Sequence, residues 1–134
     1  MPSEEAVAQA RERAIPVLDA WMTGFNALDL QAWKATMHFP HFRLASGIMH
    51  RWEDADMDDE FIARVRTGLG NIGWHHSVWT RREIVHCSDE KIHVDTQFTR
   101  YREDGSVIAA HDSLYVLTYE GGRWGVKMRS SFAR

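Results

Sequence analysis

The 134-residue sequence predicts a single α+β domain, with helices in its first half and an antiparallel sheet in its second. Apolar residues recur at three- and four-residue steps from Val7 to Leu28, which is the period of an amphipathic helix. From Trp74 onward the pattern changes to two-residue alternation, in four long runs separated by compact turns. The change of period therefore predicts a helical part followed by a strongly curved antiparallel meander.

Composition supports one domain over residues 1–134. Hydrophobic residues make up 44% of the chain, enough for a core without disulfides or a structural metal. The single cysteine, Cys87, excludes an internal disulfide and agrees with a reducing compartment. The first residues, MPSEEAVAQARER, are too polar for a secretory signal, and no apolar run reaches the roughly 20 residues of a membrane span. We therefore expect a cytoplasmic protein without a membrane partner.

Charge argues against nucleic acid as a partner. The net charge is −3 at pH 7, and lysines and arginines are scattered among acidic residues. Nucleic-acid binding depends on a basic patch that neutralises phosphates, and the sequence contains none.

Helix signals define three segments. Ser3 is a good N-cap for a helix over residues 4–27, in which Pro16 should cause a kink or a break. Asp29 can cap a short helix over 29–36, and Asp56 a third over 56–68 that Gly68 and Gly70 would end.

Strand signals come next. Phe42–Ala45 and Ile48–Trp52 predict a short hairpin, and turns at 88–90, 104–105 and 121–122 divide the four long runs. One face of each long run should cover the helices. The predicted inner residues are Ile92, Val94, Thr96 and Phe98 in one run, Trp124, Val126, Met128 and Ser130 in the last, and Ile108, Ala110, Leu114 and Val116 between them.

Asp112 falls on the predicted apolar face of the third of these runs. An isolated buried carboxylate is costly, so Asp112 should be hydrogen-bonded, paired, or neutral with a raised pKa. It is the main candidate for acid chemistry, and a purely structural hydrogen bond is the alternative.

A second group of reactive side chains lies between the first helix and the first strand, at Trp33, His38, His41 and Arg43. Pro40 prevents a helix there, so the two histidines do not share a helical face. A zinc site from His38, His41 and His76 is disfavoured, because no compact spacing brings three or four ligands together. We expect no metal and no cofactor.

The order of elements resembles the nuclear transport factor 2-like (NTF2-like) superfamily, and within it the SnoaL-like branch. The resemblance rests on FNALDLQAWKATMHFPHFRLASG after the first helix and on the closing hairpin YVLTYEGGRWGVKMRSSF. It implies a cone of three helices packed in a curved, mainly antiparallel sheet. The superfamily includes ketosteroid isomerases, polyketide cyclases, scytalone dehydratase and limonene epoxide hydrolase, and also transport factors and members without chemistry.

In such enzymes an apolar ligand lies in the cone beside a few carboxylate, histidine or tyrosine side chains. The resemblance therefore assigns Asp112 to the acidic position before the final hairpin, with His38 or His41 as the base. The isomerases' general-base aspartate has no counterpart here, and Trp21 and Phe25 occupy the helix that carries their tyrosine. The candidate pocket residues are Trp21, Phe25, Trp33, Arg43, His76, Val94, Phe98 and Met128, whereas anion binding is not expected of Arg43 or Arg129.

The sequence leaves two functional hypotheses open. One is a domain that binds a small hydrophobic molecule and carries out lyase- or isomerase-type proton transfer with Asp112 and His38 or His41. The other is a non-catalytic binding or dimerisation module. A homodimer through the open sheet is also expected, because the later strands should expose large apolar side chains at Trp79, Val85, Tyr101, Tyr115, Leu117 and Tyr119.

Overall fold

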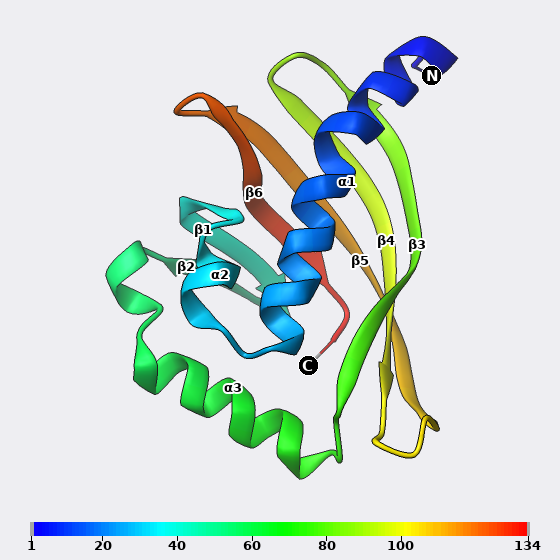
Figure 1. The fold of residues 1–134 in the computed structure, drawn as a ribbon. Coiled ribbons are helices and arrows are strands. Elements are labelled where there is room, and N and C mark those ends of the chain that lie inside the picture. The colour runs from blue at the N-terminus through cyan, green and yellow to red at the C-terminus, as the bar shows by residue number, and fades with distance from the viewer. Residues whose placement is uncertain (1, 134) are drawn as a thin grey trace.

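The computed structural model describes residues 2–133 as one α+β cone (Figure 1). In chain order the elements are α1 (Glu4–Asn26), α2 (Leu30–Lys34), β1 (Met37–Ala45), β2 (Ile48–Trp52), the 3₁₀ turn η1 (Asp54–Asp56), α3 (Asp59–Asn71), β3 (His76–Cys87), β4 (Lys91–Tyr101), β5 (Val107–Glu120) and β6 (Arg123–Ser131). The predicted fold class is thus confirmed.

The six strands form one sheet in the order β2-β1-β6-β5-β4-β3. Only β1 and β6 pair in parallel, and the other neighbours are antiparallel. The sheet twists and curls around α1, which lies along its concave face, while α3 lies beyond the end of α1 and leads into β3 (Figure 1). Among residues 2–133, no helix has the combined length and apolarity to cross a membrane.

Local capping explains most helix starts. The Ser3 hydroxyl accepts a hydrogen bond from the Ala6 N–H (3.1 Å), and Asp29 caps α2 in the same way through Ala32 (3.1 Å). The expected break at Pro16 is absent, since α1 continues through it.

The third helix runs from Asp59 to Asn71, whereas the sequence predicts residues 56–68. The cap of α3 is Asp58, which accepts from the Phe61 N–H at 2.9 Å, whereas Asp56 belongs to η1. The helix continues past Gly68 and Gly70 to Asn71 and ends before Gly73, whose φ of 74° is the left-handed conformation that glycine favours.

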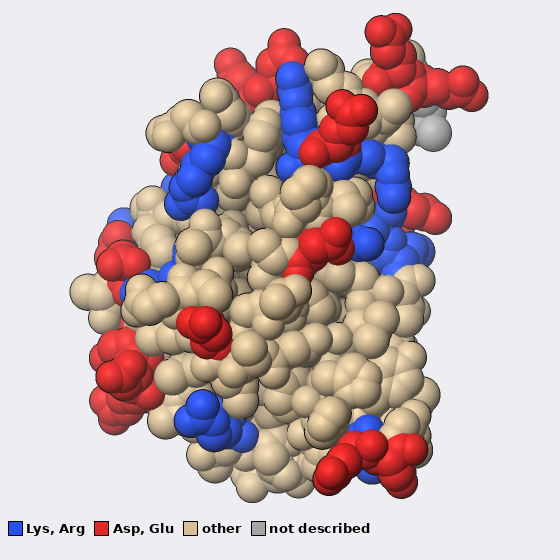
Figure 2. Space-filling view, in the orientation of Figure 1, with Lys and Arg blue, Asp and Glu red and all other residues tan. Residues whose placement is uncertain are grey.

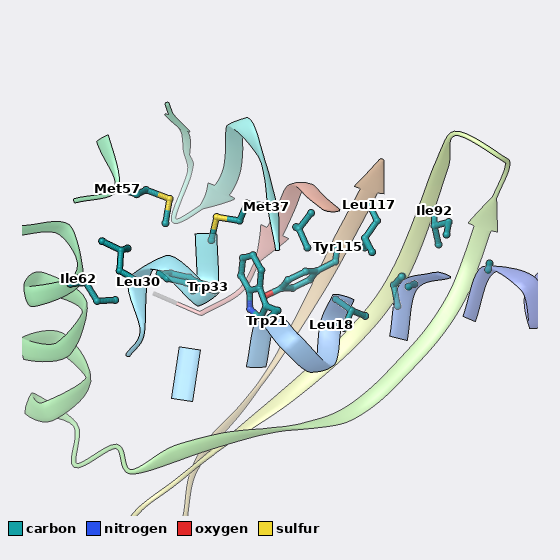
Figure 3. Packing of buried hydrophobic residues seen from close by; sticks show 14 residues of the cluster. Leu18, Trp21, Leu30, Trp33, Met37, Met57, Ile62, Ile92, Tyr115 and Leu117 are labelled. Atoms are coloured by element: carbon teal, nitrogen blue, oxygen red, sulfur yellow. The ribbon is translucent and has the colours of Figure 1, made fainter. Parts of the chain in front are cut away.

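The core joins α1 to the middle of the sheet. The ring of Trp21 lies edge-on to Trp33 and to Tyr115, with centroid separations of 5.3 Å in both pairs (Figure 3). The Trp79 Nε1–H donates to the Leu18 carbonyl of α1 at 2.8 Å. Gly24 lets α2 approach closely, because a Cβ there would lie 2.8 Å from the Trp33 nitrogen.

A bulge at Lys127 in β6 changes which side chains face the helices. Leu117 pairs with Val126 but Val116 pairs with Met128, so Lys127 is the extra residue. The two-residue alternation is therefore reversed beyond it. Arg129 faces the cone and Met128 faces away, which corrects the predicted inner position of Met128.

The predicted outward residues also need correction. Tyr115 and Leu117 are buried on the concave side, and Trp79 packs on the core. Val85 and Tyr119 do remain exposed, at 36% and 51%. The outer face nevertheless carries an apolar patch. In β1, β2, β5 and β6, side chains alternate between the two faces of the sheet, and several of those on the outer face are apolar. We call this the outer apolar patch: Phe42, Leu44, Met49, Leu114, Val116 and Met128.

Candidate functional site

The cone is not filled by side chains. A cavity of about 670 Å³ lies between α1, α3 and the concave face of the sheet. Trp21 and Phe25 of α1, Phe61 of α3, and Phe98 and Tyr115 of the sheet form aromatic walls. Arg64 and Gly68 of α3, which line the cavity, are exposed. On the face of the molecule drawn in Figure 2, most charged side chains lie toward the periphery. Most of the residues that line the cavity are apolar.

Several predicted pocket residues line this cavity. They are Trp21, Phe25, Trp33, Arg43 and Phe98. Of the others, Val94 is fully buried in the core and Met128 faces outward. His76 stacks on Tyr101, with ring centroids 5.1 Å apart, and does not line the cavity.

Asp112 lies on the outer face, so its predicted position inside the cone is wrong. Its carboxylate accepts from Arg81 at 3.0 Å and from the Gln97 amide at 3.3 Å, and its side chain is 61% exposed. The hydrogen bond from Arg81 lowers the pKa of Asp112, so of the three states expected for this carboxylate it is hydrogen-bonded and paired, and not neutral with a raised pKa. The physical reason is the phase of β5: His111 and Tyr115 face the cavity, and Asp112 lies on the opposite side of the strand.

His38 and His41 are buried but do not line the cavity. Nε2 of His38 lies 3.1 Å from the Arg123 carbonyl oxygen. Nε2 of His41 accepts from Arg129 Nε at 3.3 Å, and Nδ1 lies 3.2 Å from the Val126 carbonyl. Arginine can only donate, so the proton of His41 must be on Nδ1, where it is donated to Val126.

Burial, followed by the charge of Arg129, lowers the pKa of His41 to about 3. His41 is therefore neutral at physiological pH, and both of its ring nitrogens are occupied. Its contact with Arg129 makes it a support for that side chain. The structure does not bring Asp112, His38 and His41 to one cavity.

Arg129 is the central cation of the cavity. Its guanidinium carbon lies 5.0 Å from the Trp21 ring centroid and 5.9 Å from that of Trp33. Burial lowers the pKa of Arg129 to about 10. Arg129 is paired across the sheet with Arg43 on β1 and with Tyr115 on β5, so two cations and a phenol share one row of the concave face.

Arg100 on β4 adds a third cation to the lining, with its guanidinium carbon 5.5 Å from the Phe98 ring centroid. Burial lowers the pKa of both Arg100 and Arg43, and the charge of Arg43 lowers that of Arg100 further. No aspartate or glutamate is among the described residues that line the cavity. These positive charges consequently lack a carboxylate partner within it.

The cavity lining also holds hydrogen-bond donors without acceptors. Within residues 2–133, the buried side-chain nitrogens and oxygens that lack a partner are Trp33 Nε1, Arg43 Nε and Arg100 Nε. All three belong to residues that line the cavity, and all three are donors. Arg43 uses Nη2 to donate to the Ala133 carbonyl at 2.9 Å, which leaves Nε unpaired.

Two further titratable groups line the cavity. Burial and then the charge of Arg100 lower the pKa of His111, so its imidazole is neutral at pH 7. Burial raises the pKa of Tyr115, so its hydroxyl keeps its proton. A neutral imidazole can accept a proton and a phenol can donate a hydrogen bond.

The described residues 2–133 contain no group of three His, Cys, Asp or Glu side chains arranged to hold a metal. His75 and His76 meet through their Nδ1 atoms at 2.9 Å, but His38 and His41 are engaged elsewhere.

Sequence reasoning missed Arg100, Arg129, His111 and Tyr115 as cavity residues. His111 and Tyr115 carry a signal in hindsight, because they alternate with Asp112 and Leu114 and one of the two sets must face inward. Arg129 gave no such signal, since the bulge at Lys127 is not visible in the alternation.

Comparison with known proteins agrees with this architecture. A ketosteroid isomerase-like protein from Erwinia carotovora atroseptica is similar with a TM-score of 0.62 at 20% identity, over 98% of this chain and 97% of that one. An NTF2-like protein from Novosphingobium aromaticivorans has a TM-score of 0.75 at 8% identity, over 93% and 82% of the two chains. A protein from Catenulispora acidiphila in complex with S-DNPA has a TM-score of 0.71 at 13% identity, over 93% of each chain.

These likenesses show the fold alone. No curated protein matches the chain. The profile of one family, described as NTF2-like protein (DUF6841), matches residues 11–129, which is most of the sequence. The superfamily predicted from the sequence is thereby confirmed, and the chain belongs to the NTF2-like protein family DUF6841.

Proposed function

We propose that this domain binds a small hydrophobic molecule inside its cone. The observation that carries the proposal is the cavity of about 670 Å³ with aromatic walls. Ligand pockets commonly have this size and are lined mainly by apolar side chains with a few polar groups. The proposal keeps the hydrophobic ligand expected of a SnoaL-like domain and does not depend on Asp112.

Binding without turnover is the simpler form of this function, because none of the described residues that line the cavity is a carboxylate base. A second candidate, proton transfer, is favoured by His111. Its neutral imidazole lines the cavity near Arg100, whose charge would stabilise an anion formed on the ligand. In this version His111 takes the role first assigned to His38 or His41, and Tyr115 supplies the hydrogen bond first assigned to Asp112.

Binding of 1-pyrenebutanol, a neutral polycyclic probe, tests the proposed function. We expect saturable binding, measured by pyrene emission, because the rings of Trp21, Trp33 and Phe98 offer apolar contact. Val65→Trp should weaken binding by about tenfold or more, since Val65 lines the cavity and a larger side chain would occupy its space.

The matched control is Val85→Trp, at a position that is 36% exposed and outside the cavity lining. This variant should bind like the wild type. Equal weakening in both variants, or no saturable binding to the wild type, would contradict a ligand site in the cone.

We also propose that the protein forms a homodimer through the outer apolar patch. Leu44 and Met49 are paired across β1 and β2 and are 41% and 53% exposed. A second copy would cover this patch by two-fold symmetry.

Cys87 is a free cysteine, which is consistent with the cytoplasmic location that we propose.

Sedimentation at micromolar concentration is expected to show a dimer for the wild type and a monomer for Leu44→Asp, which places a charge in the patch. Ile48→Asp is the control, because Ile48 is 55% exposed but is paired with Ala45, the residue after Leu44, and so points to the other face. It should remain dimeric. A monomeric wild type would refute the proposal.

A further inference from the structure

We propose that the ligand of this cavity is a hydrophobic carboxylate, with its carboxylate held by Arg43 and Arg100 and its apolar body held between the aromatic walls. This inference rests on the proposed function and names the class of ligand.

The first argument is the pattern of unpaired donors. Trp33 Nε1, Arg43 Nε and Arg100 Nε are buried without a partner in the described chain, and each belongs to the cavity lining. A buried polar group without a hydrogen bond costs free energy, so native structures rarely retain several in one place. Because all three unpaired groups are donors on side chains that line the cavity, the lining is rich in donors, and a ligand with acceptors suits it best.

The second argument is charge. Arg43, Arg100 and Arg129 line one largely apolar cavity, and the described lining residues include no aspartate or glutamate. Burial lowers the pKa of each guanidinium, yet even that of Arg129 stays at about 10, so all three keep their charge at neutral pH. An anionic ligand would compensate charges that the protein itself leaves uncompensated.

The third argument is shape. A guanidinium is planar and matches a carboxylate with parallel hydrogen bonds. Arg100 lies against the ring of Phe98, and Arg129 lies against Trp21 and Trp33, so the cations are adjacent to the aromatic surfaces. A molecule with a flat apolar body and one carboxylate can meet both surfaces at once.

The test compares 1-pyrenebutyrate with 1-pyrenebutanol, which differ in the carboxylate but share the pyrene ring. We expect the wild type to bind the carboxylate at least about tenfold more tightly than the alcohol. In Arg100→Met and in Arg43→Met, the ratio of the affinity for 1-pyrenebutyrate to that for 1-pyrenebutanol should fall toward one. Both variants should continue to bind the alcohol, which would show that the cavity is intact.

Arg66→Met is the matched control. Arg66 is an exposed arginine of α3 that lies outside the cavity lining. This variant should keep the preference. Equal affinity of the wild type for both probes overturns the inference and leaves the proposed function standing, whereas binding of neither probe overturns both. A preference that survives in Arg43→Met and Arg100→Met also overturns the inference.

Discussion

Arg129→Met is expected to raise the free energy of unfolding by about 2 kcal/mol. Arg129 is a partly buried cation in the cavity lining without a carboxylate partner there, and burial lowers its pKa to about 10. Methionine has a similar length and no charge, so the desolvation cost disappears. The contacts with Trp21 and His41 offset part of that cost at present, which limits the gain.

Urea unfolding at pH 7.5 measures this effect, and Arg123→Met on the same strand is its control. Arg123 donates to the Ala35 carbonyl at 3.1 Å and to the Met37 carbonyl at 2.6 Å. Its replacement leaves these acceptors without their partner and should therefore lower stability. If Arg129→Met lowers stability as well, Arg129 serves the fold and the cost assigned to its burial is wrong.

Acidification is expected to destabilise the protein through His41 before the carboxylates titrate. The pKa of His41 falls from 6.5 in the unfolded chain to about 3 in the folded protein. Because the unfolded state binds this proton first, stability is fully present above pH 6.5 and is lost as the pH falls toward 3. At about pH 5 the loss should reach about 2 kcal/mol.

Urea unfolding at about pH 7.5 and about pH 5 checks this expectation in the wild type and in His41→Gln. The variant should lose less than half as much stability between the two values. Part of the loss should remain, because the pKa values of His93 and His111 are also lowered by burial. An unchanged loss in His41→Gln would show that His41 is not the titrating group.

The fold was accessible from the sequence because local signals agree with the tertiary structure. Ser3 and Asp29 cap helices where the sequence predicts them. The alternation of Ile92, Val94, Thr96 and Phe98 places these residues on the concave face. Where two good caps were available, at Asp56 and Asp58, the sequence prediction took Asp56 and the structure uses Asp58.

The site was less accessible, because strand alternation fixes the relative faces of residues and not which face is the inner one. In β5 both faces are partly apolar: Leu114 and Val116 lie outside, and Tyr115 and Leu117 inside. Asp112 looked anomalous only because the outer face was taken as the inner one. In β6 the bulge at Lys127 reversed the pattern and brought Arg129 into the cone.

The histidines were difficult for another reason. Their positions near the first strand were clear, but whether a ring nitrogen reaches the cavity or the backbone depends on contacts across about 85 residues of chain, such as that of His41 with Val126. No local pattern encodes such a contact.

A crystal structure of the protein with 1-pyrenebutyrate tests the central claim most directly. We predict that the pyrene lies between Trp21, Trp33 and Phe98, and that carboxylate oxygens lie about 2.7–2.9 Å from nitrogens of Arg43 and Arg100. A ligand bound outside the cone, or one whose carboxylate points into solvent away from both arginines, would contradict the claim.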